Sequence, residues 1–190
     1  MPRPKTLSDL DVLKTAHRLI HLHGPDALTF ASVAQACGLS AATLVQRFGT
    51  KAGLIRATLL YAWDRLDEKT AALAAAMPKT PDGAIRLLVG LSGDYGGVEA
   101  YAEGLRVLRE DFRDPVLRAR GAAWKAALSK ALDACFAEVP DAPEGIGLIM
   151  ASQWQGSLLW WGFEPTTSVE RHVEDGLRRF VRTVVRSECD

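Results

Sequence analysis

Apolar residues recur along this chain at the spacing of a helix. Between positions 8 and 23 they stand at i, i+1, i+4, i+7 and i+8, as Val12, Leu13, Ala16, Leu19 and Ile20, which places them on one helix face. Alanine-rich runs at 70–76 and 122–134 have strong helix propensity. The sequence contains no sustained alternation of β-branched and polar residues bounded by turn dipeptides, the pattern of strands. The pattern therefore predicts an all-α protein.

Glycine and proline divide the chain into blocks of helix length. The breaks fall at Gly24-Pro25, Gly38, Gly49, Met77-Pro78 to Pro81, Gly96-Gly97, Asp114-Pro115, Pro140 to Pro143 and Glu164-Pro165. We expect about nine helices and no sheet, without internal repeats or low-complexity linkers.

The stretch TFASVAQACGLSAATLVQRF at 29–48 carries the most specific pattern. Thr29 and Ser40 are both suited to cap the N-terminus of a short helix. Between them, Phe30, Val33, Ala34 and Cys37 form one apolar face, and Gly38 supplies a turn that Leu39 anchors. The stretch thus predicts two short helices joined by a tight turn.

The second of these helices, 40–47, buries Leu44 with Phe48 beside it. It projects Ala41, Ala42, Thr43, Gln46 and Arg47 outwards. A short helix pair with a glycine turn and a mostly polar exposed second face is typical of a helix-turn-helix. The alternative is a helical hairpin that only packs, because Ser/Thr caps and glycine turns occur in any helical protein.

At this point the sequence resembles the tetracycline-repressor-like (TetR) family of bacterial transcriptional regulators. The resemblance is carried by VLKTAHRLIHLHG and LTFASVAQACGLSAATLVQRFGTKAGL, from about Val12 to Leu59. It implies an N-terminal three-helix DNA-binding domain, which we place at 1–56. It also implies a helical effector-binding and dimerisation domain, which we place at 57–190.

The resemblance also assigns residues to DNA. Thr29 and Lys51 match positions that touch phosphate, and the recognition helix holds Ser40, Ala41, Ala42, Thr43, Val45, Gln46 and Arg47. Gln46 is suited to pair with adenine, and Arg47 either with guanine or with phosphate. Two positions depart from the family, which often has a basic residue at Ala41 and commonly an aromatic at Val45. We therefore expect the grip on DNA to rely more on Arg47, Lys51, Thr43 and the tail residues Arg3 and Lys5.

The charges of the chain balance only as a total. The 23 basic and 23 acidic residues sum to zero. Residues 1–56 alone carry +4, from seven Lys/Arg against three acids, and the remaining residues carry −4. A basic N-terminal unit joined to an acidic one is consistent with nucleic-acid binding, although four charges are a modest excess.

Composition excludes several other classes. An apolar fraction of 48% argues against disorder and against a collagen-like chain. The longest uncharged stretch, Gly145 to Phe163, contains Ser152, Gln153, Gln155 and Ser157, so no transmembrane helix is predicted. The polar N-terminus does not resemble a secretory signal, and we expect a cytoplasmic protein.

Catalytic and metal motifs are incomplete. His17 and His21 stand at i, i+4, but no further ligand cluster accompanies them, and solvated or capping histidines are the simpler interpretation. The segment Gly90–Asp94 falls short of a nucleophile elbow, and Gly145-Ile146-Gly147 lacks the third glycine of a dinucleotide fingerprint. Cys37, Cys135 and Cys189 are far apart. We expect no enzyme, no metal and no cofactor.

The second half of the chain predicts a sensor and a dimer. Aromatic residues concentrate there, and the family resemblance implies a small-molecule pocket; our candidate lining is Tyr101, Phe112, Trp124, Met150 and Trp154, with ordinary core packing as the alternative. A narrow apolar stripe on the last helix serves either the core or, as in the family, a dimer interface; its members are Val169, Val173, Leu177, Phe180, Val181 and Val184. The family resemblance implies that the stretch from Gly145 to Trp161 supplies the other helix of that interface, with Trp161 as a predicted member.

Taken together, the sequence predicts a ligand-responsive homodimer that represses transcription from a palindromic operator and is released by a small hydrophobic or aromatic effector. Two alternatives stand beside it: a helical small-molecule-binding protein, and an interaction module, both without DNA binding. Duplex binding that weakens steeply with salt distinguishes the first from the other two.

Overall fold

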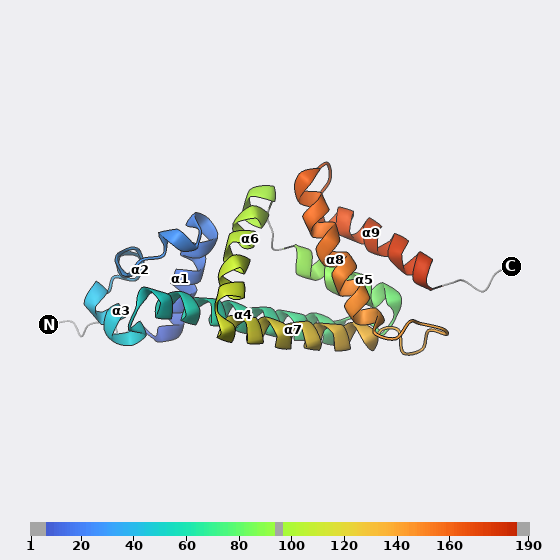
Figure 1. Cartoon of the computed structure of the whole chain (residues 1–190), viewed down its shortest axis with the longest axis horizontal. Helices are drawn as coiled ribbons and strands as arrows, with labels where there is room; N and C mark the ends of the chain where they lie inside the picture. Colours follow the sequence, from blue (N-terminus) through green and yellow to red (C-terminus); the bar gives the residue numbers. More distant parts are fainter. Residues whose placement is uncertain (1–6, 94–96, 186–190) are drawn as a thin grey trace. The chain divides into compact units, whose positions relative to one another are not determined.

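The computed structural model describes residues 7–93 and 97–185, and this part of the chain forms nine α-helices, one short 3-10 helix and no strand (Figure 1). The predicted all-α class is confirmed. Two compact units are present: Met1–Arg65 with Glu103–Gly121, and Leu66–Ala102 with Ala122–Asp190. The chain passes from one unit to the other within helices α4, α6 and α7 rather than through linkers. The division that the sequence suggested, after residue 56, lies inside α4.

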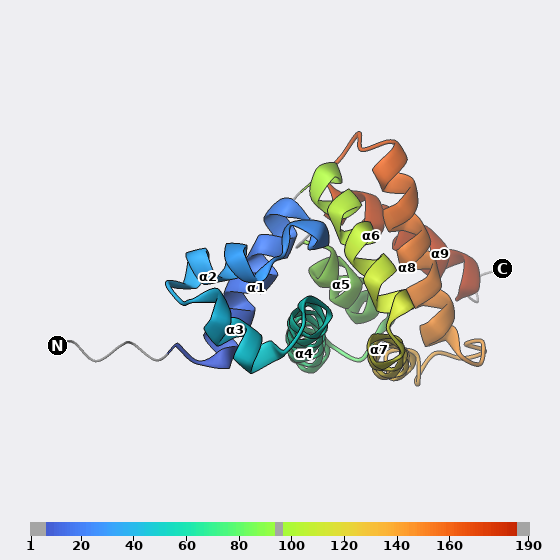
Figure 2. The same cartoon turned by 60° about the vertical axis from the view of Figure 1, so that its left-hand side comes forward.

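The first unit is built around a small helical core. It contains α1 (Asp9–His23), η1 (Pro25–Ala27), α2 (Phe30–Cys37) and α3 (Ala41–Phe48), with the start of α4 (Lys51–Ala76), the end of α6 (Val98–Arg113) and the start of α7 (Pro115–Asp133). The predicted faces of the first helices pack into it: Val12, Ala16 and Ile20 from α1, Val33 and Ala34 from α2, and Leu44 from α3 are all buried. Figure 2 shows α1, α2 and α3 gathered together.

The second unit has its own core. It contains α5 (Pro81–Ser92), α8 (Ile146–Phe163) and α9 (Val169–Val184), together with the remaining parts of α4, α6 and α7. Helix α9 packs against both α5 and α8. Leu88, Met150 and Leu158 are among its fully buried side chains.

Side-chain caps set where most helices begin. Ser8, Thr29, Ser40, Thr80 and Ser168 each accept a hydrogen bond from the backbone N–H three residues on. The first N–H groups of a helix have no partner inside it, so each cap satisfies one of them. The predicted caps Thr29 and Ser40 are thus confirmed.

A close contact with α7 explains why a glycine stands at position 147, in the first turn of α8. A Cβ on Gly147 would lie 2.2 Å from the carbonyl oxygen of Ser129, and its own N–H donates to Asp133 Oδ1 at 2.7 Å. The start of α8 therefore approaches the end of α7 too closely for any side chain. This glycine serves packing, in agreement with the rejection of a dinucleotide motif.

Two indole N–H groups, of the buried Trp154 and the half-buried Trp124, have acceptors inside the second unit. Trp154 Nε1 donates to Ser92 Oγ at 2.8 Å, and Trp124 Nε1 donates to Thr70 Oγ1 at 3.0 Å. Ser92 Oγ in turn donates to the carbonyl of Leu88. Because buried polar groups are costly when unpaired, these bonds fix the orientation of the two rings.

Within residues 7–93 and 97–185, no helix has both the length and the apolarity to cross a membrane.

The Ser92–Trp154 bond generates a stability prediction. Ser92→Ala leaves the indole N–H of Trp154 buried without an acceptor, which lowers the free energy of unfolding by about 1–3 kcal/mol. Urea denaturation followed by circular dichroism measures the change. Ser152→Ala is the control, because Ser152 is exposed and its hydroxyl only donates to the Leu148 carbonyl. Equal losses in the two variants contradict the assigned role of Ser92.

Candidate functional site

Helices α2 and α3 form the predicted helix-turn-helix, with caps at both helix starts. Thr29 Oγ1 accepts from the backbone N–H of Ser32, whose own hydroxyl accepts from the N–H of Thr29 in a reciprocal capping box. Gly38 ends α2 in the left-handed conformation, at φ 67°, where a residue with a Cβ is strained. Ser40 then caps α3 and contacts the hydroxyl of Thr43 at 2.8 Å. The geometry of the turn is therefore encoded locally.

One side chain anchors α3. Leu44 is completely buried, and Phe48 packs partly buried against the same core. The opposite face is open: Ala41, Ala42, Val45 and Gln46 are exposed, and Thr43 is half-buried. This exposed surface consists of small side chains, one amide and one hydroxyl, the residue types that can approach base edges closely.

Arg47 is held inside the unit instead of projecting from it. Its Nη1 donates to the carbonyl of Leu7 at 2.8 Å and pairs with Asp9 at 3.3 Å, and its side chain is only 22% exposed. The sequence placed this residue on the outward face. In the structure it ties the end of α3 to the start of α1, so the guanidinium is already engaged by protein acceptors.

Lys51 lies at the first turn of α4 and is exposed. Its Nζ donates to the Asp26 carbonyl at 3.2 Å, which leaves further N–H donors of the ammonium free to bind an anion. Thr50, just before it, caps α4 by accepting from the N–H of Gly53. The sequence analysis missed Thr50, although a threonine before a helical run is an identifiable cap signal. Arg3 and Lys5, expected to add to the grip, lie outside the described residues.

Ion pairs connect the end of α6 and the residue that follows it to η1 and α4. Arg106 Nη2 pairs with Asp26 at 2.7 Å, and Arg56 of α4 pairs with Asp114, next to the end of α6, at 2.6 Å. The hydrogen bond from Arg56 lowers the pKa of the Asp114 carboxyl. These contacts make residues 103–121 part of the first unit, which no local sequence pattern indicated.

His17 and His21 do come together. Their Nε2 atoms lie 3.1 Å apart, and the ring of His17 also contacts Tyr61 edge-on. Burial lowers the pKa of His17 to about 4, with His21 and Arg65 as further causes. Within the described ranges, no group of three or more His, Cys, Asp or Glu side chains is placed to hold a metal ion.

The five proposed ligand-lining residues do not form one site. Trp124 and Trp154 have ring centroids 6.4 Å apart, and Met150 and Tyr101 belong to the same core cluster of the second unit. Phe112 belongs to the first unit and is 64% exposed. The four interior residues are packed core side chains here, and Phe112 is not among them.

The residues predicted for a dimer interface all contact the core of their own chain. Trp161, Val169, Val173 and Leu177 are buried in the core of their own chain, and Phe180, Val181 and Val184 are partly buried against it. The apolar stripe of α9 faces α5 and α8, so it is occupied within the protomer. The helical spacing of apolar residues shows that one face of a helix is buried, but it does not show whether the same chain or a second copy covers that face.

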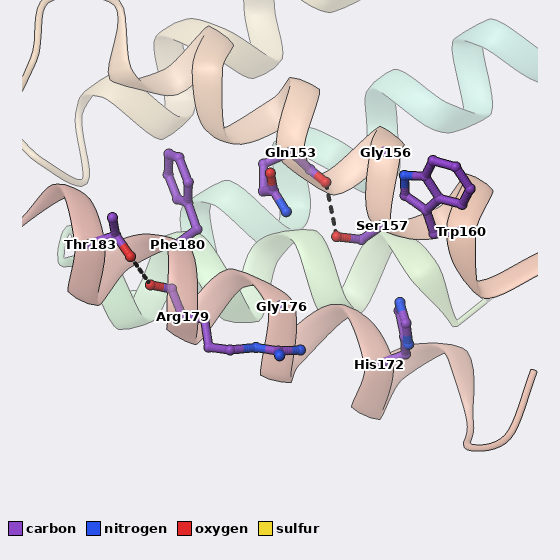
Figure 3. A pocket seen from close by; sticks show the side chains of 9 residues that line it. All are labelled: Gln153, Gly156, Ser157, Trp160, His172, Gly176, Arg179, Phe180 and Thr183. Atoms are coloured by element: carbon purple, nitrogen blue, oxygen red, sulfur yellow. Dashed lines mark hydrogen bonds between the residues drawn. The ribbon is translucent and has the colours of Figure 1, made fainter. Parts of the chain in front are cut away.

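Helix α8 carries an exposed apolar surface. Its exposed large side chains are Leu148, Ile149, Leu159, Trp160 and Phe163, and Trp160 is 68% exposed. Beside them, a groove of about 490 Å³ runs between α8 and α9. Figure 3 shows Trp160 and His172 at one end, Phe180 and Thr183 at the other, and Gly156 and Gly176 between them. Helix α8 contains no charged residue and has apolar side chains on every side, although its exposed face also carries Ser152, Gln153 and Gln155.

Comparison with known proteins supports this architecture. Residues 12–58 match the model of the family described as bacterial regulatory proteins, tetR family. No protein in a search of curated sequences matches the chain.

Several solved structures share the fold. The TetR family transcriptional regulator PfmR from Thermus thermophilus is 19% identical with a TM-score of 0.61, over 94% of this chain and 99% of that one. A protein from Saccharomonospora viridis in complex with choline is 18% identical with a TM-score of 0.72, over 90% and 93%. AibR in complex with isovaleryl coenzyme A and operator DNA is 19% identical with a TM-score of 0.61, over 92% and 96%. At these identities the similarity establishes the fold alone.

The lowered pKa of His17 predicts a pH-dependent stability. The unfolded chain takes up a proton on His17 near pH 6.5, and the folded chain only near 4. Between these values the unfolded state binds more protons, so the free energy of unfolding falls as the pH decreases from 6.5 towards 4. His17→Asn should remove part of this fall, as measured by urea denaturation across that range. An unchanged pH profile in the variant contradicts the assignment.

Proposed function

We propose that this chain is a homodimeric repressor that leaves its operator when a small effector binds. Its residues 12–58 match the family of bacterial regulatory proteins, tetR family. The observation that carries the proposal is the capped α2–turn–α3 pair, because it holds an exposed face of small and polar residues on a rigid core. A helix presented in this way fits the major groove. Such a protein acts in the cytoplasm, where bacterial DNA lies.

On DNA, we assign positioning and sequence reading to different residues. Lys51 and the Thr29 capping region contact phosphate, since the ammonium of Lys51 and the helix start at Thr29 both favour anions. Gln46 reads a base edge, with Ser40, Ala41, Ala42, Thr43 and Val45 forming the surrounding contact surface. Arg47 orients α3 through Leu7 and Asp9 and contributes to DNA only indirectly.

The dimer interface is proposed to be the exposed face of α8. A helix without charged residues and with large apolar side chains on every side is normally covered on most of its surface, yet one side of α8 remains open in the single chain. A two-fold copy of the same face would cover it, and Gly156, where a Cβ would have no neighbour within 4 Å, leaves space in the groove for a partner's Trp160. Two-fold pairing also presents two α3 helices to half-sites about one DNA turn, ~34 Å, apart.

Effector binding is proposed to act through α6. The end of this helix belongs to the first unit, where Arg106 pairs with Asp26 of η1 and Asp114, the next residue after the helix, pairs with Arg56 of α4. A ligand that moves α6 therefore also moves the DNA-reading helices. Structural relatives bind ligands as different as choline and isovaleryl coenzyme A, so the fold does not name the effector. A ligand reaches the Trp124–Trp154 cluster only by separating packed side chains, and it binds only if it favours that state.

The phosphate role of Lys51 predicts a uniform loss of affinity. Lys51→Ala should weaken binding to all duplexes similarly and reduce the slope of log affinity against log salt by about one per protomer. Fluorescence anisotropy with DNA from the region upstream of the gene measures both quantities. Lys130→Ala is the matched control, because it removes the same charge from the second unit. Loss of discrimination at a single base pair contradicts the assignment.

The α8 interface predicts a change of oligomeric state. Trp160→Glu places a charge on the face that pairs two copies, so sedimentation velocity should find dimers of the unchanged protein and monomers of the variant. Leu22→Glu is the control, since Leu22 is equally exposed but belongs to α1. A variant that still forms dimers, or an unchanged protein that is monomeric, rejects this interface.

A further inference from the structure

Asp111, on the inner face of α6, is a buried carboxylate with one hydrogen-bond donor. The residue is only 7% exposed. Its Oδ1 accepts from Trp63 Nε1 of α4 at 3.0 Å, and within residues 7–93 and 97–185 no ion pair involves this carboxylate. Burial raises the pKa of Asp111, the Trp63 bond lowers it and the neighbouring Glu110 raises it, so no cation contributes.

Two other carboxylates of this region, unlike Asp111, form ion pairs with arginines of the described chain. Asp114 pairs with Arg56 at 2.6 Å, and Asp64 pairs with Arg120 at 3.0 Å. Both are more accessible to water than Asp111, yet each has its own arginine. A buried charge normally has a partner, because its desolvation is otherwise uncompensated. Asp111 has the greatest need for a cation and receives none from the described chain.

Trp63 adds the second element of a cation site. Its six-membered ring lies against Gly121 of α7, where a Cβ would stand 3.2 Å from Cζ2 and 3.3 Å from Cη2. The absence of a side chain at position 121 therefore accommodates the indole beside α7. An indole face attracts ammonium groups, and a carboxylate at its edge adds a full negative charge.

We propose that Asp111 and Trp63 form the recognition point for an effector that carries an organic ammonium group. The proposal rests on the regulatory function proposed above and adds the chemical class of its effector. The position of Asp111 also connects the proposed site to the DNA-reading helices. Asp111 lies one helical turn before Asp114, and Asp114 forms an ion pair with Arg56 in the first turns of α4. A cation that binds Asp111 acts on the segment that holds Arg56.

The test measures the binding of matched probes to the full chain by isothermal titration calorimetry. Hexylammonium is the cationic probe, hexanol its neutral match and hexanoate its anionic match. Hexylammonium should bind at least about tenfold more tightly than hexanol, and hexanoate should not bind, because a charge-assisted contact adds about one to two orders of magnitude in affinity. Equal affinity for hexylammonium and hexanol, or no binding of hexylammonium, overturns the proposal.

Substitutions of Asp111 distinguish a role in binding the ammonium group from a role in folding. Asp111→Asn keeps an oxygen that accepts from the Trp63 indole but removes the charge, so affinity for hexylammonium should fall about tenfold to a hundredfold while thermal stability is retained. Asp111→Glu restores the charge and should recover part of the affinity, even if Asp111→Asn folds poorly. Asp64→Asn is the control, because Asp64 lies on α4 but its side chain is 65% exposed. Unchanged affinity in Asp111→Asn overturns the proposal.

Duplex binding, measured in the same samples, separates this inference from the proposed function. Hexylammonium binding without any duplex binding supports the cation site and rejects the repressor. Duplex binding without hexylammonium binding rejects the cation site and leaves the repressor standing. When both occur, hexylammonium should weaken duplex binding in the unchanged protein more than in Asp111→Asn, and an equal effect in the two proteins overturns the effector role.

Discussion

The burial of Leu44 is the interaction on which the DNA-reading surface depends. Helix α3 has only eight residues, too few to be stable alone in water, so its position is set by what it packs against. Leu44 is its one completely buried side chain, Ser40 fixes its start, and Arg47 ties its end to the residues around the start of α1. With α3 held at three points, its opposite face is free to contact DNA.

Local chemistry made this region predictable from the sequence. The caps at Thr29 and Ser40, the left-handed turn at Gly38 and the burial of Leu44 each depend on a few neighbouring residues, and all four are found. The role of Arg47 depends on a carbonyl 40 positions away, so its direction could not be inferred from helical spacing. The Asp111–Trp63 contact spans 48 positions and left no sequence signal for the same reason.

The same limit applies to the C-terminal helices. A stripe such as Val169, Val173 and Leu177 shows that one side of α9 is buried, but both its own chain and a second copy satisfy that pattern. The structure assigns the stripe to the protomer core and leaves the outer face of α8 open. The sequence feature of α8 is that it has no charged residue and large apolar side chains on opposite faces, so two of its sides favour burial.

The central claim is that two protomers related by a two-fold axis bind duplex DNA, each through α3 and the start of α4. Hydroxyl-radical footprinting on DNA upstream of the gene tests it most directly, because cleavage reports each contacted backbone position. The account predicts protection of an inverted repeat in two patches about one helical turn apart, lost as salt increases. No protection at low salt, or protection of a single patch, would contradict it.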